Sequence, residues 1–224
     1  MKRIIVIGEG QTEQSFCNDV LRPYFSLKGI YIQNPVISKT GGGIVNWKAL
    51  KHQVEMTLLQ DQTAFVTTLI DYYGLYSRHQ YPRWEEAEKL VDKNSRMKKL
   101  EDAMLMDIET DLQRRFIPYI QLHEFEALLF SEIDVFNNNF EKKEFLDYNY
   151  LVETIDKNSN PEMINNGTET APSKRLGKII KGYYSDKENN KAFYGSTLAH
   201  DIGLQKIRSK CPRFNNWIAT LENI

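Results

Sequence analysis

Acidic residues follow three of the four apolar runs that the sequence predicts to be β-strands. Each comes directly after its run: Glu9 after residues 3–8, Asp71 after residues 64–70, and the pair His123-Glu124 after residues 116–122. Ligands of open parallel α/β sheets bind at the carboxyl ends of the strands, so we expect these side chains to meet at one edge. Clustered carboxylates raise each other's pKa unless a cation neutralises them, and an all-oxygen ligand set favours Mg²⁺ or Mn²⁺. The spacing therefore predicts a divalent-metal site.

Two further acids lie beside these positions. Glu13 begins the helix that follows Glu9, where it either reaches into the site or stabilises the positive helix N-terminus. Glu126 lies two residues past Glu124, and on a helix their side chains would point apart. We therefore expect one of the two to face the site and take Glu124, nearer the strand end, as the first metal ligand and Glu126 as the second candidate. His123 has three roles open to it: general base, phosphate contact, or hydrogen-bonded structural histidine.

Phosphate contacts are predicted at two other places: Gly41, Gly42 and Gly43 after the second apolar run, and Lys174 with Arg175 at the start of a late helix. Backbone N–H groups of the glycine segment can face phosphate, although it matches neither GxxxxGK[ST] nor GxGxxG, which argues against an NTPase. The basic pair follows Ser173, a predicted N-cap. We expect this pair to hold phosphate or to stabilise developing negative charge in catalysis.

The elements that must position these residues alternate along the first part of the chain. Apolar runs predict four strands, at residues 3–8, 30–38, 64–70 and 116–122. Helical spacing predicts helices between and after them, at residues 12–27 with Thr12 as N-cap, from residue 47, from residue 84, and at residues 125–130. Such alternation is typical of an α/β fold, a Rossmann-like and mainly parallel four-stranded sheet flanked by helices.

The character of the sequence changes after residue 134. Residues 135–166 are polar and rich in asparagine, and helices are predicted at residues 172–183, 191–210 and 214–221. We interpret residues 1–134 as the α/β domain and residues 135–224 as a helical C-terminal extension packed on it.

Composition narrows the classes of function. The net charge is −1, so overall attraction to nucleic acid is weak and binding would need local features. Two basic groups are candidates, the Lys174 pair and the tail residues Lys206, Arg208, Lys210 and Arg213. Tyr72, Tyr73 and Tyr76 could stack on bases or pack beneath their loop.

The sequence also indicates where the protein is found. No run reaches the ~20 apolar residues of a membrane span, and no signal peptide is evident, so we expect a cytoplasmic protein. In that compartment we expect its two cysteines, Cys17 and Cys211, to be free.

Several segments together resemble a known bacterial family. The strand-Glu-Gly-x-Thr-Glu start, Asp-Tyr-Tyr-Gly at residues 71–74 and His-Glu-Phe-Glu-Ala-Leu-Leu-Phe at residues 123–130 are similar to the group called domain of unknown function 4276. Pro-Ser-Lys-Arg-Leu at residues 172–176 and Cys-Pro-Arg-Phe at residues 211–214 extend the resemblance over nearly the whole chain.

The group in turn resembles the Toprim superfamily of topoisomerases, primases and overcoming-lysogenisation-defect nucleases. That resemblance implies a Toprim-like fold with Mg²⁺ bound by a Glu after the first strand and by Asp-x-Asp after the third, which correspond to Glu9 and Asp71. Tyr73 stands where the second Asp is expected, so Glu124 or Glu126 would have to replace it. The resemblance also implies an ATPase partner and a role in anti-phage defence.

Two hypotheses follow from these observations. In the first, the protein is a metal-dependent nuclease that hydrolyses DNA or RNA, with Glu9, Asp71 and Glu124 around Mg²⁺. In the second, it is a non-catalytic Toprim-like partner that binds an ATPase or nucleic acid. A third hypothesis, phosphotransfer on a lone Asp as in receiver domains, is weaker because the expected lysine is missing. A homodimer is the most common assembly of such soluble proteins.

Overall fold

The computed structural model describes residues 2–37, 46–164, 167–184 and 190–224. Five strands form one sheet: β1 (Lys2–Gly8), β2 (Ile30–Gln33), β3 (Phe65–Asp71), β4 (Phe116–Ile117) and β5 (Ile120–Gln121). β1 lies between β2 and β3, and β3 also pairs with β4 and β5. All of these pairings are parallel. The predicted α/β class with a parallel sheet is confirmed, and the sheet has one more strand than expected.

The additional strand arises because Pro118 interrupts the run at residues 116–122. Proline has no backbone N–H to give to a sheet ladder, so β4 stops before it and β5 starts after it. Threonine side chains of β3 bridge the interruption: Thr67 Oγ1 donates to the Ile117 carbonyl at 2.6 Å, and the Tyr119 N–H donates to Thr68 Oγ1 at 2.9 Å. The chain therefore stays beside β3 and delivers residues 123–126 to the end of that strand.

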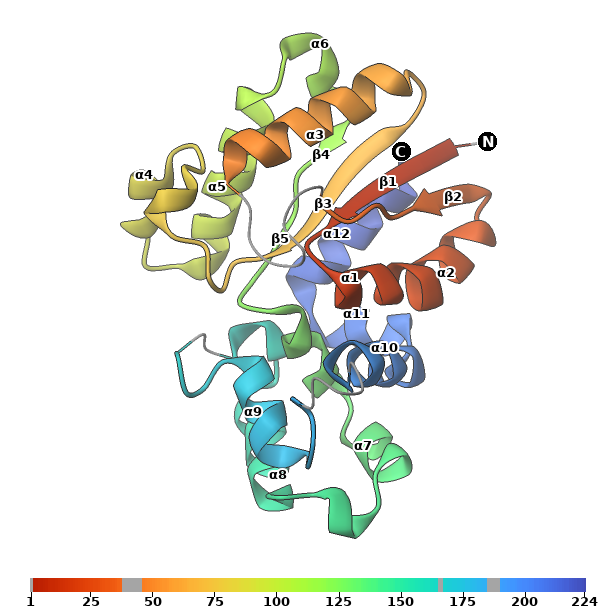
Figure 1. Ribbon diagram of the computed structural model, residues 1–224, viewed down its shortest axis with the longest axis vertical. Coiled ribbons are helices and arrows are strands. Elements are labelled where there is room, and N and C mark those ends of the chain that lie inside the picture. The colour runs from red at the N-terminus through yellow and green to blue at the C-terminus, as the bar shows by residue number, and fades with distance from the viewer. Residues whose placement is uncertain (1, 38–45, 165–166, 185–189) are drawn as a thin grey trace.

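Helices cover both faces of the sheet (Figure 1). On one face lie α3 (Trp47–Gln60), α4 (Trp84–Glu88), α5 (Lys93–Asp107) and α6 (Thr110–Gln113). On the other lie α1 (Gln11–Phe16), continued by a π-helical turn (Cys17–Leu21) and α2 (Arg22–Ser26), together with α11 (Leu204–Lys210) and α12 (Pro212–Glu222). Alternate residues of β1 divide between the two cores, as a strand buried on both faces requires: Ile5 lies in the same core as Leu50, and Ile4 in the same core as Phe214.

The remaining helices lie below the sheet in Figure 1. They are α7 (Ile133–Asn139), α8 (Tyr148–Lys157), α9 (Pro172–Ile179) and α10 (Asn190–Ile202), preceded by a 3₁₀ segment (Phe125–Ser131). Short 3₁₀ turns lie at Ser77–His79, Lys142–Glu144 and Pro161–Met163. One continuous core joins sheet residues such as Ile4 to Leu151 and Leu176 of these helices. Gly203, at φ +78°, divides the helix predicted at residues 191–210 into α10 and α11.

Within the described ranges, no helix combines the length and the apolar character that crossing a bilayer requires. Cys17 and Cys211 are both buried and free of disulfide bonds.

Candidate functional site

Asp71, the last residue of β3, connects the ends of three strands. Its backbone N–H donates to Glu9 Oε2 at 3.2 Å, and its own Oδ1 accepts from the Phe125 N–H at 2.8 Å. Glu9 directly follows β1, and Phe125 follows β5 by four residues. The structure thus brings together the acids that follow β1, β3 and β5.

The charges of four glutamates act on Asp71. The pKa of Asp71 lies well above its usual range, first because the carboxyl group is desolvated, and then because of the charges of Glu9, Glu13, Glu126 and Glu124. Each of these neighbours makes ionisation of Asp71 less favourable. We call Glu9, Glu13, Asp71, Glu124 and Glu126 the carboxylate cluster. In the described part of the chain, no three acidic, histidine or cysteine side chains already have the arrangement of a metal site.

Glu13 has the capping role that was one of its two predicted alternatives. Its Oε2 accepts from the Gly10 N–H at 2.8 Å, and the residue is buried. Gly10 is the N-cap of α1, so the prediction that Thr12 caps this helix is wrong. Gly8 permits the close approach of helix and strand, since a Cβ at Gly8 would lie 3.0 Å from the Glu13 Cβ. The Glu13 side chain therefore both caps α1 and belongs to the carboxylate cluster.

Glu124 is held by the first turn of α9. The Ser173 N–H donates to Glu124 Oε2 at 2.8 Å, and Ser173 Oγ donates to Oε1 at 2.9 Å. Ser173 was predicted to cap its own helix, but Ala171 precedes α9 and Pro172 occupies its first position. Because proline there has no N–H, the first donor of the helix is that of Ser173, which Glu124 satisfies.

Glu126 is buried at 1% exposure and accepts a hydrogen bond from Tyr183 Oη at 3.5 Å. The charges of Glu124 and Glu126 both raise the pKa of Asp71, so both carboxylates lie within electrostatic reach of it. The reason lies in the backbone: Glu124 is extended, at φ −137° and ψ 154°, and precedes the first turn of the 3₁₀ segment. Helical spacing therefore does not apply to this pair.

A family model described as Domain of unknown function (DUF4276) matches residues 8–222. The chain belongs to the DUF4276 family. Comparisons with curated proteins and with solved structures gave no match. The matched range contains the whole carboxylate cluster and the α9 contact to Glu124.

The predicted phosphate contacts of this DUF4276 protein are placed only in part, on α9 next to Ser173. Gly41, Gly42 and Gly43 fall outside the described residues. Lys174 is exposed, with its ammonium 5.0 Å from the centre of the Tyr184 ring. Arg175 donates from Nε to the Thr170 carbonyl at 2.9 Å and from Nη1 to Thr154 Oγ1 at 3.1 Å. These contacts tie Arg175 to its own surroundings in the helical part of the chain.

His123 adopts an unusual conformation at the junction of β5 and the 3₁₀ segment. Its φ is +68°, which is uncommon outside glycine, and its carbonyl accepts from the Tyr73 N–H at 2.7 Å. The side chain is fully buried, and Nε2 lies 2.9 Å from Lys93 Nζ. Burial, then the charges of Lys93 and Arg96, lower the pKa of His123 to about 3. The ring is thus neutral at physiological pH and poorly suited to be a general base, one of its three predicted roles.

Lys93 was not singled out from the sequence. It is the first residue of α5 and lies thirty positions before His123 along the chain, so no local pattern links the two. Its side chain is half-buried, and its pKa is lowered by that burial and by the charge of Arg96.

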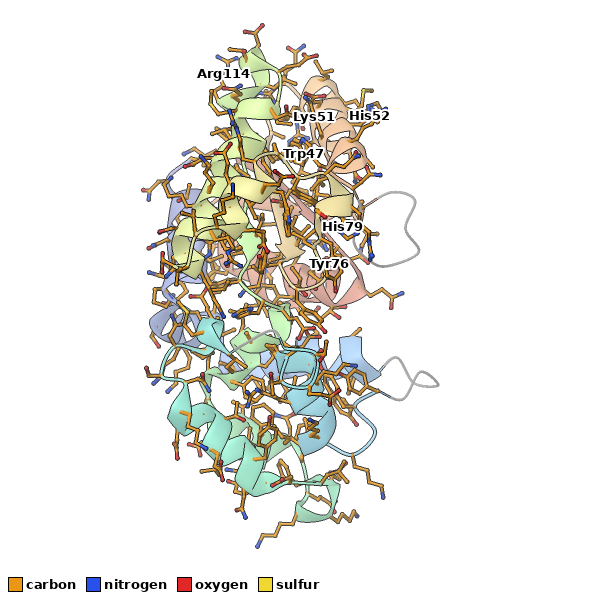
Figure 2. All side chains as sticks on the ribbon, turned by 90° about the vertical axis from the view of Figure 1, so that its left-hand side faces the viewer. Trp47, Lys51, His52, Tyr76, His79 and Arg114 are labelled. Atoms are coloured by element: carbon orange, nitrogen blue, oxygen red, sulfur yellow. The ribbon has the colours of Figure 1, made fainter. Side chains whose placement is uncertain are left out.

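The tyrosines after Asp71 divide between the two predicted roles. Tyr72 is buried, stacks on Trp84 and hydrogen-bonds to Glu88, so it packs beneath the loop. Tyr76 is 52% exposed, with the Arg78 guanidinium 4.7 Å from its ring centre. Figure 2 shows Tyr76 beside His79, well below Lys51, His52 and Arg114. An exposed ring with a cation beside it is suited to stacking on a base.

Proposed function

We propose that this DUF4276 protein is a Mg²⁺-dependent nuclease with a Toprim-like α/β domain, whose carboxylate cluster gathers the metal for phosphodiester hydrolysis. One observation carries the proposal: hydrogen bonds fasten Asp71 between Glu9 and Phe125, so that acids from three strand ends share one place. This is the edge of a parallel sheet at which ligands bind.

The residues of the cluster suit a divalent cation in donor chemistry and in charge. They supply only carboxylate oxygens, which hard cations prefer. A cation would also relieve the repulsion that raises the pKa of Asp71. Glu9, Asp71 and Glu124 would hold the metal, with Glu126 supplying the oxygen that Tyr73 does not. Bound Mg²⁺ would polarise the scissile phosphate and make water more acidic.

The rest of the chain positions these acids. Ser173 holds both oxygens of Glu124, and the Gly10 N–H holds Glu13 at the start of α1. Because Ser173 belongs to α9, the helical second half of the chain completes the site. The proposed substrate is DNA or RNA, and the exposed ring of Tyr76 would stack on one of its bases. We propose that the protein acts in the cytoplasm in anti-phage defence, together with an ATPase partner.

Cleavage assays test the proposal. Purified protein is incubated with plasmid DNA and with total tRNA in Mg²⁺, Mn²⁺ or EDTA, beside Glu9→Gln and Asp71→Asn. Asp102→Asn is the matched control, since Asp102 is an exposed acid on α5 that forms an ion pair with Lys98 at 3.0 Å. We expect metal-dependent cleavage that falls at least about 100-fold in both cluster variants and persists in the control. Metal-dependent cleavage retained by Glu9→Gln would reject the assignment.

Two observations favour a second function. Tyr73 replaces an expected acid, and the described side chains do not already form a metal site. We therefore keep a non-catalytic partner of an ATPase as the alternative. Such a protein would cleave neither substrate in any metal, and its thermal stability would be the same in Mg²⁺ and in EDTA.

A further inference from the structure

We infer that Tyr184 and Lys174 form a binding site for one nucleotide beside the carboxylate cluster, in which the Tyr184 ring stacks on an unpaired base and Lys174 binds the adjoining phosphate. The inference rests on the proposed function and narrows its substrate to single-stranded nucleic acid, because the bases of a duplex are already paired and stacked. It starts from the contact between the two side chains, in which the ammonium lies 5.0 Å from the ring centre.

Each of these residues directly follows a residue that contacts the carboxylate cluster. Lys174 follows Ser173, which donates two hydrogen bonds to one glutamate of the cluster. Tyr184 follows Tyr183, whose Oη donates to a second glutamate of the cluster at 3.5 Å. Ser173 and Tyr183 are buried, whereas Lys174 and Tyr184 are exposed. The segment therefore holds two acids with its inner side chains and presents a ring and a cation to solvent next to them.

Gly177 allows the Tyr184 ring to lie against α9. A Cβ at Gly177 would overlap with the Cε2 and Cδ2 atoms of the ring, so one edge of the ring packs on the backbone of the helix. The side chain as a whole is still 45% exposed. Because the helix supports the ring, little conformational freedom is lost when a base stacks on it.

Lys174 is suited to the phosphate of the same nucleotide. Its ammonium has three N–H donors and lies over the Tyr184 ring, where the attraction is a cation–π contact. A base that stacks on this face displaces the ammonium, which then makes a charge-assisted hydrogen bond to the adjoining phosphate. An aromatic ring with a cation beside it is the combination by which proteins bind single strands.

The loop that carries Tyr76 lies near the same helix. Burial, then the charges of Glu124, Tyr76 and Glu169, raise the pKa of Tyr73. Lys178 of α9 donates to the Glu169 carbonyl at 2.9 Å. Glu169 therefore lies between the exposed side of α9 and the Tyr73–Tyr76 loop. A strand whose bases are splayed apart can stack one base on Tyr76 and another on the α9 ring, which a duplex cannot do.

Four variants separate a nucleotide site from a structural role. Tyr184→Leu removes the ring, and Tyr184→Phe keeps it. Gly177→Ala leaves the ring in the sequence but displaces it from the helix. Lys174→Met removes the charge. Tyr31→Leu, at an exposed tyrosine of β2, and Lys98→Met, at an exposed lysine of α5, are the matched controls.

The measurement is the affinity for a labelled pyrimidine oligonucleotide of about 12 nucleotides, single-stranded or annealed to its complement, by fluorescence anisotropy in EDTA. We expect the single strand to bind at least about fivefold more tightly than the duplex, and to lose about fivefold or more of its affinity in Tyr184→Leu and Gly177→Ala. Tyr184→Phe and both controls should keep the affinity. Lys174→Met should reduce the slope of log affinity against log salt by about 0.7, the value for one phosphate contact on a single strand.

Equal single-strand affinity in wild type and Tyr184→Leu, or a duplex bound as tightly as the single strand, would overturn the inference. Its failure is distinguishable from that of the nuclease proposal, because binding in EDTA requires no metal and no turnover. Ring-dependent binding by a protein that cleaves nothing would support the nucleotide site and count against the nuclease. Metal-dependent cleavage of a single strand with a KM unchanged by Tyr184→Leu would do the reverse.

Discussion

Poorly exposed acids lie in two regions of this protein, and their surroundings are opposite in charge. In the carboxylate cluster, Asp71 is surrounded by glutamates, and its pKa is raised. Around the C-terminal helices, acids instead meet arginines: Arg208 of α11 pairs with Glu222 of α12 at 3.0 Å, and Arg213 of α12 pairs with Glu101 of α5. The Arg208 contact is the largest of the causes that lower the pKa of Glu222 to about 2.

The difference separates acids that lie beside arginines from acids that lie beside other acids. Arg213 also donates to the Ile120 carbonyl at 3.0 Å, and Glu162 accepts from the N–H groups of Arg213 and Phe214. These bonds fasten α12 to β5 and to the Pro161–Met163 turn. The cluster instead gathers like charge at a sheet edge, which costs stability unless a cation binds. Such a cost is typical of functional sites.

The largest expected effect on stability comes from removing an arginine that pairs with a poorly exposed acid. We predict that Arg213→Met lowers the free energy of unfolding by about 3 kcal/mol, because Glu101 and the Ile120 carbonyl lose their partner in a poorly exposed place. Urea denaturation measures this change. Arg114→Ala, at an exposed arginine labelled in Figure 2, is the control and should change stability by no more than about 0.5 kcal/mol. A loss below about 1 kcal/mol in Arg213→Met would contradict the role given to this arginine.

Removing charge from the carboxylate cluster should instead raise the stability of the protein. Asp71→Asn keeps the oxygen that accepts from Phe125 but not the charge, so in EDTA at pH 7.5 we expect its thermal midpoint to rise by about 2–4 °C, the equivalent of about 1 kcal/mol. The folded pKa of Asp71 is raised, so the cost of its charge begins near the unfolded pKa of about 3.9 and is complete above the folded pKa. The gain should therefore disappear at pH 4 and below. A variant less stable than wild type at pH 7.5 would show that Asp71 is not under repulsion.

The smallest effect is expected at Glu222. Its folded pKa is lowered to about 2, so its contribution is present above the unfolded pKa of about 4.3 and is lost as the pH falls toward 2. We predict that Glu222→Gln costs about 0.5–1 kcal/mol at pH 7, a modest value because the pair is partly solvated. Denaturation at pH 7, 4 and 2.5 should show this difference shrinking. An equal difference at all three pH values would assign it to packing instead of charge.

The sequence predicted the fold class and the meeting of the strand-end acids for a physical reason. Buried parallel strands are continuous apolar runs, and residues that follow such strands share one sheet edge. Glu9, Asp71 and Glu124 could be selected in this way. The split at Pro118 could also have been foreseen, since proline cannot donate to a ladder.

The features of the site that the sequence did not predict depend on contacts between segments that are far apart in the sequence. Ser173 reaches Glu124 across forty-nine residues, and Lys93 reaches His123 across thirty. Neither follows from periodicity, because each partner is ordinary in its own neighbourhood. The simultaneous burial of Glu124 and Glu126 was missed because helical spacing was assumed where the backbone is extended.

Metal binding by the cluster is the central claim, and calorimetric titration with Mn²⁺ and Mg²⁺ at pH 7.5 tests it most directly. Wild type is compared with Asp71→Asn in the cluster and with Glu222→Gln, an acid from the arginine-paired region, as control. We predict a saturable site in wild type and in Glu222→Gln that is lost, or weakened at least about tenfold, in Asp71→Asn. A wild type that binds neither ion, or an Asp71→Asn variant that binds as tightly as wild type, would contradict the account.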